Sequence, residues 1–137
     1  MNTETKIRDA HRPGKWATWT GRILSAVTVL MLLFSAALKF MRPPNVVDAF
    51  VHQFGYPESM LLILGVLEVT CAALFVIPST AFLGAILVTG YLGGAIATHA
   101  RIGDPAFVNP LVLGFFAWAG LYLRDTRLCQ LMPLRKP

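Results

Sequence analysis

The chain has 137 residues, of which 55% are hydrophobic and only 14% are charged. Soluble domains average about 45–50% apolar and about 25% charged residues, so this chain has too little polar surface to cover a globule in water. Disorder is also excluded, because it needs low hydrophobicity and high net charge. The length suits one domain, or about four membrane-crossing helices.

Four long apolar stretches follow one another, at residues 23–38, 59–77, 80–98 and 106–123. Each approaches the length that a helix needs to cross a hydrocarbon core roughly 30 Å thick, and only helices or closed barrels satisfy backbone groups in lipid. Arg22 and Lys39 can snorkel to the two interfaces and so extend the first stretch. We therefore predict spans at about 18–41, 59–77, 80–99 and 106–123. A cleavable signal peptide is the alternative for the first stretch.

The connections between the stretches predict further helical structure. After Pro43-Pro44, apolar residues recur at helical spacing over 45–54 and Gly55 follows, which indicates a short amphipathic helix at the membrane interface. Pro78-Ser79 makes a tight turn between spans two and three, with Ser79 or Thr80 as the expected helix cap. Two dipeptides are candidates for the start of span four: Asp104-Pro105 and Asn109-Pro110.

The predicted fold is an all-α membrane protein, an antiparallel four-helix transmembrane bundle with a short interfacial helix between spans one and two. Nine Lys and Arg residues lie in the two terminal regions and three in the other loops. The positive-inside rule then places both termini in the cytoplasm. Basic cytoplasmic tails at 1–17 and 125–137 flank a transmembrane domain at 18–124. These tails carry most of the net charge of +5, so we expect no nucleic-acid partner.

Small residues mark the helix faces that we expect to pack together. On the first span, small and polar residues recur at steps of three and four from Gly21 to Lys39. Gly65 lies on the same side of span two as Glu68. Gly90, Gly93 and Gly94 lie on span three, where Gly90-x-x-x-Gly94 is a close-approach motif. We predict packing within the bundle, with a homodimer face as the alternative.

One block of the sequence resembles a known family. It is GAILVTGYLGGA at 84–95, which continues through His99, Arg101 and Gly103-Asp104-Pro105. Lys39, GYP at 55–57 and GLYLRD at 120–125 fit the same pattern. Over roughly residues 20–134, the chain is similar to the DoxX-like family of small four-helix membrane proteins.

The resemblance implies an integral protein of the bacterial cytoplasmic membrane. Some members are the membrane subunit of a thiosulfate:quinone oxidoreductase or partners of thiol and superoxide defence enzymes, whereas most have no established activity. One departure concerns the loop after Gly103-Asp104-Pro105. Relatives often carry a histidine there, where this chain has Phe107-Val108-Asn109, so a two-histidine metal or proton site is not expected.

Glu68 is the most informative single residue, because it lies roughly 13 Å below the predicted interface by helix rise. A carboxylate at that depth costs about 2.5–3.5 kcal/mol unless it is paired or protonated. Three arrangements stay open. Glu68 pairs with Lys39 across a vertical gap of roughly 10 Å, bonds as a neutral acid to Ser or Thr, or lines a polar cavity.

A second candidate cluster lies at the predicted outer rim and contains His99, Arg101 and Asp104, with Lys39 nearby. Such a cluster can bind an anion or a quinone head group, although solvated loop charge is the more common arrangement. Cys71 and Cys129 lie on different levels of the fold, which excludes dithiol chemistry. The sequence contains no metal motif and no evident cofactor motif. The family resemblance suggests a quinone as the cofactor.

Three functions follow from these observations. The first is a non-catalytic membrane subunit or scaffold in a redox or quinone-linked process, which docks a soluble redox partner at its cytoplasmic face. The second is a small proton-coupled transporter that uses the intramembrane Glu68. The third is an enzyme with His99 as general base, for which the sequence positions no second catalytic group. The first is the preferred interpretation.

Overall fold

A computed structural model describes residues 14–125 and 128, and no strand occurs among them. Its four long helices are α2 (Lys15–Met41), α4 (Met60–Val76), α5 (Ala81–Arg101) and α6 (Val108–Arg124). The helical segments that contain them are long and apolar enough to cross a membrane, at Lys15–Met41, Ser59–Val76, Ala81–Arg101 and Pro105–Arg124. The predicted all-α membrane fold with four spans is therefore confirmed. The predicted tails lie almost entirely outside the described residues.

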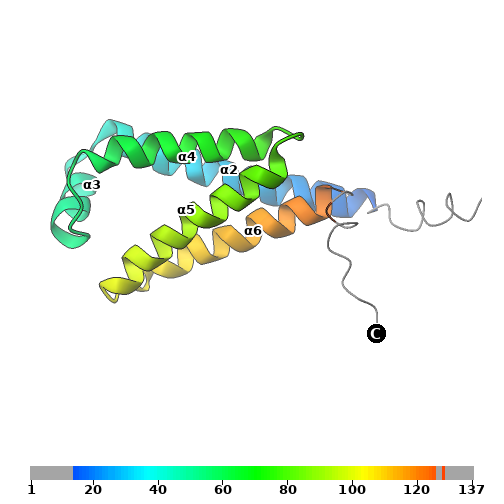
Figure 1. Ribbon diagram of the computed structural model, residues 1–137. Helices are drawn as coiled ribbons and strands as arrows, with labels where there is room; N and C mark the ends of the chain where they lie inside the picture. The colour runs from blue at the N-terminus through cyan, green and yellow to red at the C-terminus, as the bar shows by residue number, and fades with distance from the viewer. Residues whose placement is uncertain (1–13, 126–127, 129–137) are drawn as a thin grey trace, which may run out of the picture.

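Each long helix runs opposite to the one before it, as Figure 1 shows. The start of α2, the α4–α5 turn and the end of α6 lie together at what we call the terminal end. The opposite end, with residues 43–58 and the α5–α6 turn, is the loop end. Helix α2 packs against α4 and α6, and α5 packs against the same two helices. Toward the loop end, the α5–α6 pair diverges from the α2–α4 pair (Figure 1).

The segment after α2 is helical, as predicted for 45–54, but it consists of two short elements. These are α3 (Pro44–Asp48) and a π-helix, η1 (Ala49–Gln53). Pro44 lies in the first turn of α3, where its missing N–H is not needed. Gly55 then takes a φ of 72°, which reverses the chain toward α4. The location of this segment at a membrane interface stays a prediction.

The α4–α5 turn differs from the expected cap. No side chain caps the start of α5, and the Thr80 hydroxyl instead donates to the Leu74 carbonyl over 2.8 Å. Thr80 therefore satisfies the end of α4, whose last carbonyls have no partner within the helix. The turn is tight enough that a Cβ on Gly84 would lie 2.3 Å from the Phe75 backbone nitrogen.

The fourth span begins at Asp104-Pro105, the first of the two predicted candidates. The Asp104 carboxylate accepts a hydrogen bond of 2.9 Å from the backbone N–H of Ala106. This cap starts a short 3₁₀ turn, η2 (Pro105–Phe107), which leads directly into α6. Asn109 and Pro110 lie in the first turn of α6 and do not start it.

The buried faces follow the predicted stripes on α2 and α4 but not along the whole of α5. The buried residues of α2 and α4 are Gly21, Ser25, Thr28, Leu32, Ala36, Lys39, Leu61, Gly65, Glu68, Cys71, Ala72 and Phe75. On α5, burial follows Ala81, Ala85, Val88 and Leu92, whereas Gly93 is exposed. The physical reason is that α5 diverges from α4 toward the loop end, so residues in this half of α5 have no neighbour on α4 (Figure 1).

Candidate functional site

The centre of the site is a buried ion pair between two helices. The Lys39 ammonium on α2 lies 2.8 Å from Oε2 of Glu68 on α4, and the Glu68 side chain is only 2% exposed. Lys39 also donates to Ser35 Oγ over 2.6 Å. Of the three arrangements open for Glu68, the structure contains the pairing with Lys39. Charges removed from solvent are tolerable only when they are paired and hydrogen-bonded in this way.

Helix geometry explains how the vertical gap between these two residues is closed. Side chains in an α-helix lean toward its N-terminus. Because α2 and α4 run in opposite directions (Figure 1), Lys39 leans from the loop end into the bundle and Glu68 leans back toward the loop end. The bond of Lys39 to Ser35, one turn earlier, holds the ammonium in this direction.

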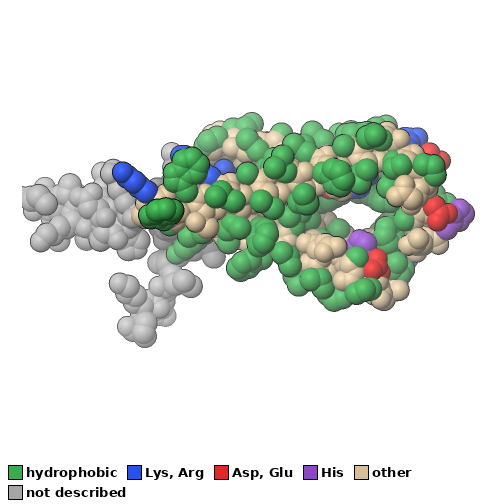
Figure 2. All heavy atoms as spheres, turned by 180° about the vertical axis from the view of Figure 1, so that it is seen from behind, with side chains coloured by type: hydrophobic (Ala, Val, Ile, Leu, Met, Phe, Trp, Pro, Cys, Tyr) green, Lys and Arg blue, Asp and Glu red, His purple; other side chains and the backbone are tan. Residues whose placement is uncertain are grey.

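A cavity of about 930 Å³ opens beside the ion pair, between the diverging helix pairs and η1. Figure 2 shows an open gap through the molecule at the loop end. Most of the lining is apolar or aromatic, and Lys39 belongs to the lining whereas Glu68 does not. The other polar groups in the lining are Ser35, Tyr56, Tyr91, Thr98, His99 and Asn109. An apolar cavity with a few polar groups is the usual form of a small-molecule site.

Three short-range contacts shape the rim of the cavity. Nδ1 of His99 lies 2.8 Å from the Asp104 carboxylate, and the His99 ring meets the Phe54 ring edge-on at 5.0 Å between centroids. The hydroxyls of Tyr56 and Thr98 lie 2.9 Å apart. The Phe54–His99 and Tyr56–Thr98 contacts tie the segment after η1 to the last turn of α5. Side chains from both elements therefore close the cavity.

The predicted rim cluster is present in part. His99 and Asp104 form a pair, and the hydrogen bonds from the Ala106 N–H and from His99 hold the pKa of the Asp104 carboxyl below its usual value. Arg101 instead donates to the Phe54 carbonyl, away from the carboxylate. Lys39 belongs to the ion pair with Glu68 and not to this cluster. The cluster is therefore one histidine–carboxylate pair with a separate arginine bond.

The predicted packing glycines divide into two groups. Gly65 packs against α2, because a Cβ there would lie 2.8 Å from the Phe40 ring. A Cβ on Gly90, Gly93 or Gly94 would meet no described atom within 4 Å outside the helix's own turn. The close packing predicted for these three within the bundle is therefore absent from the described residues. Gly90 and Gly94 line the cavity instead, and the homodimer face stays a prediction.

Another close helix contact lies between α2 and α6 at the terminal end. A Cβ on Gly21 would lie 2.8 Å from the Gly120 carbonyl oxygen, and a Cβ on Gly120 would lie 2.7 Å from Ser25 Oγ. Gly120 belongs to the GLYLRD segment, which carries part of the family resemblance and from which we predicted no close packing.

No group of three or more metal-ligating side chains occurs within residues 14–125 and 128.

Sequence reasoning did not single out several residues that line the cavity. Tyr91 lies beside Glu68, and its ring forms part of the cavity wall. Tyr56 and Asn109 lie in or next to loops, where polar residues are ordinary. A tyrosine in the middle of a predicted span was the one available signal, because a buried phenol needs a polar partner.

Taken together, the fold and the cavity define a small four-helix integral membrane protein with a polar group enclosed between its helices. A sequence profile of the DoxX-like family matches residues 23–120, and the chain belongs to this family. No curated protein and no solved structure shows significant similarity to the chain.

Proposed function

We propose that this protein is a non-catalytic membrane subunit that binds a lipid-soluble quinone in the cavity beside Lys39. The observation that carries the proposal is the combination of a large apolar cavity with hydrogen-bonding groups at its wall. A volume of about 930 Å³ suits a substituted ring, and the gap between the helix pairs leaves a path for an isoprenoid chain (Figure 2). Redox chemistry belongs to the quinone and to a partner enzyme.

The residues at the wall fit the oxygen atoms of a quinone head. Two N–H groups of Lys39 are engaged by Ser35 Oγ and Glu68, and the remaining contact, with the Ser35 carbonyl, is 3.4 Å long. Lys39 can therefore turn one N–H to a ligand oxygen. When Nδ1 of His99 donates to Asp104, Nε2 is the proton-accepting nitrogen, which suits a quinol hydroxyl.

The cavity can be tested with two neighbouring glycines on α5. Gly94 lines the cavity and Gly93 does not, yet a Cβ at either position meets no atom within 4 Å. We expect Gly94→Phe to weaken binding of a decyl-substituted benzoquinone at least about tenfold, equivalent to roughly 1.4 kcal/mol of lost binding energy. Gly93→Phe is the matched control and should bind as the parent protein does.

Binding is measured by ultrafiltration of the purified protein in detergent, with the quinone quantified by chromatography. Decylbenzene, which has the chain and the ring but no carbonyl oxygens, measures simple partitioning. Equal binding by the two glycine variants, or equal retention of quinone and decylbenzene, would contradict the proposal.

The second function considered from the sequence, a proton-coupled transporter, has less support. In such a transporter, the carboxylate of Glu68 has to reach the transported molecule. Glu68 instead forms an ion pair with Lys39 and does not line the cavity. For the subunit role, the positive-inside rule favours cytoplasmic termini. The basic tails would then be the surface that receives a soluble redox partner.

A further inference from the structure

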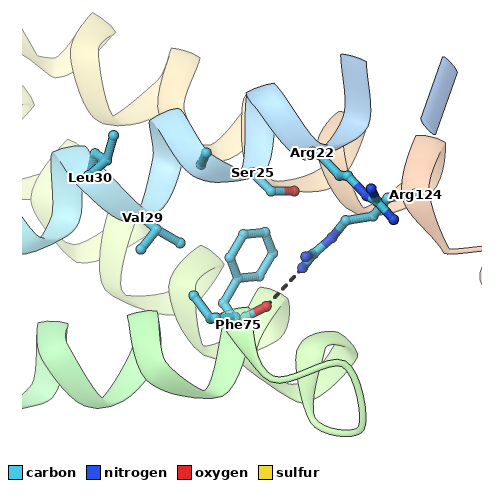
Figure 3. A pocket seen from close by; sticks show the side chains of 8 residues that line it. Arg22, Ser25, Val29, Leu30, Phe75 and Arg124 are labelled. Carbon is cyan, nitrogen blue, oxygen red and sulfur yellow. Dashed lines mark hydrogen bonds between the residues drawn. The ribbon is translucent and has the colours of Figure 1, made fainter. Parts of the chain in front are cut away.

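We propose that a second site, at the terminal end of the bundle, binds one anionic phospholipid. It is a pocket of about 340 Å³, separate from the large cavity, and residues of α2, α4 and α6 line it. Figure 3 shows Arg22 and Arg124 at one end of this pocket and Val29 and Leu30 toward the other. A pocket that is cationic near the helix ends and apolar deeper in the bundle has the polarity of a phospholipid.

Arg124 is fixed in place at this site by neighbouring groups. It donates to the Phe75 carbonyl over 2.8 Å, and its guanidinium lies 5.0 Å from the centre of the Phe75 ring (Figure 3). Its Nε is buried and has no hydrogen-bond partner among the described residues. Asp125 lies close enough to act on Arg124 electrostatically and lowers the net charge of the group. Arg124 therefore supplies an oriented donor set with part of its positive charge compensated.

Arg22 supplies the second cation and is exposed. Its guanidinium lies 5.7 Å from the centre of the Trp19 ring, a cation–π contact that holds it beside this ring. No carboxylate pairs with Arg22 within the described part of the chain. Two guanidinium groups with one nearby carboxylate leave a net positive charge, so the site favours a phosphodiester lipid without a cationic head group. Guanidinium groups match phosphate oxygens in geometry as well as charge.

Ser25 provides an independent observation that points to a ligand. The residue is 4% exposed, lines the same pocket, and its hydroxyl has no hydrogen-bond partner among the described residues. An unpartnered buried hydroxyl is unusual in a folded protein. In Figure 3, Ser25 lies between the arginine end and the apolar end of the pocket. This is the level at which an ester oxygen follows the phosphate of a bound glycerophospholipid. Basic pockets between membrane helices are a known form of lipid head-group site.

The test measures thermal unfolding of the purified full-length protein in a nonionic detergent. Phosphatidylglycerol is the probe, and phosphatidylcholine and inorganic phosphate are the comparison ligands. A ligand that binds only the folded state raises the unfolding midpoint, and the rise grows with the logarithm of its concentration once this exceeds Kd. We expect phosphatidylglycerol to raise it by several degrees, with little effect of either comparison ligand. An equal effect of phosphatidylcholine would contradict the preference for an anionic head group. An equal effect of inorganic phosphate would show that the site binds a phosphate ion and not a phospholipid.

Two pairs of variants locate the site. Arg22→Gln should weaken phosphatidylglycerol binding about fivefold, the factor that one basic residue near an anionic lipid contributes. Arg42→Gln removes the same charge at the loop end and should leave binding unchanged. Ala26→Phe fills the pocket without a change of charge and should also weaken binding, whereas Ile23→Phe, outside the pocket, should not. Binding that is the same in all four variants would overturn the site.

Discussion

Lys39 and Glu68, 29 residues apart in the sequence, form an ion pair of 2.8 Å across the α2–α4 contact. The pair lies beside the cavity. Lys39 lines the cavity, whereas Glu68 is buried and does not line it. Its position makes Lys39 part of both the bundle core and the cavity wall. A change at either residue is therefore expected to affect stability first and ligand binding second.

Removing one member of this pair should destabilise the bundle strongly. We expect Lys39→Met or Glu68→Leu to lower the free energy of unfolding by about 3–5 kcal/mol, because each leaves a buried charge without its partner. The double variant should recover most of this loss, because apolar residues of similar volume can replace a buried pair. Unfolding in mixed micelles, analysed as a double-mutant cycle, measures the coupling. Strictly additive losses would contradict the pairing.

Glu68→Gln distinguishes the structural role from proton-coupled transport. The amide keeps the size of the side chain and a hydrogen bond to Lys39 but removes the charge. If the pair is structural, the variant should lose stability while proton fluxes across reconstituted vesicles stay at the level of protein-free vesicles for both proteins. A substrate-driven proton flux in the parent protein that Glu68→Gln abolishes would instead establish the transporter.

Gly84 should be the glycine least tolerant of substitution in the α4–α5 hairpin. Its Cβ would lie 2.3 Å from the Phe75 nitrogen and 2.5 Å from the Phe75 Cα, and backbone atoms cannot move aside as a flexible side chain can. We expect Gly84→Ala to cost about 1–3 kcal/mol, as overpacking typically does. Gly90→Ala meets no neighbour within 4 Å and should be neutral or stabilising by up to about 1 kcal/mol, because alanine favours the helix. Equal effects of the two substitutions on thermal unfolding would contradict the close contact.

The Asp104 carboxyl should give the loop end a dependence on acid. Its pKa is lowered in the folded protein, first by the Ala106 N–H and then by His99. The stabilisation is therefore complete above the unfolded-state value of about 4 and is lost as the pH falls through the lower folded value. The unfolding midpoint of the parent protein should fall more steeply below about pH 4 than that of Asp104→Asn.

Asp48→Asn is the control for this measurement. Asp48 and His52 are both well exposed and their charged atoms lie 3.9 Å apart, so this pair contributes little. Its variant should keep the steep acid dependence of the parent protein. An Asp104→Asn profile that coincides with the Asp48→Asn profile would show that the cap and the His99 contact do not carry the effect.

The amino-acid sequence by itself determined the four helices and the buried stripes of α2 and α4. Lipid-facing helices need long apolar runs, and a stripe of small and polar residues at helical spacing has to face protein. These are local properties of one segment, so they can be derived without knowing its neighbours. The start of α6 does not follow from the sequence alone, because Asp104-Pro105 and Asn109-Pro110 both have the composition of a helix start.

Only the tertiary structure decided how the helices meet. The pairing of Lys39 with Glu68 depends on the axial offset of α2 and α4, which no single helix specifies. The exposure of Gly93, and the place of Gly90 and Gly94 in the cavity wall, depends on the divergence of α5 from α4. A cavity is the space that several elements leave between them. Its lining is therefore fixed by their relative positions and not by the pattern of any one of them.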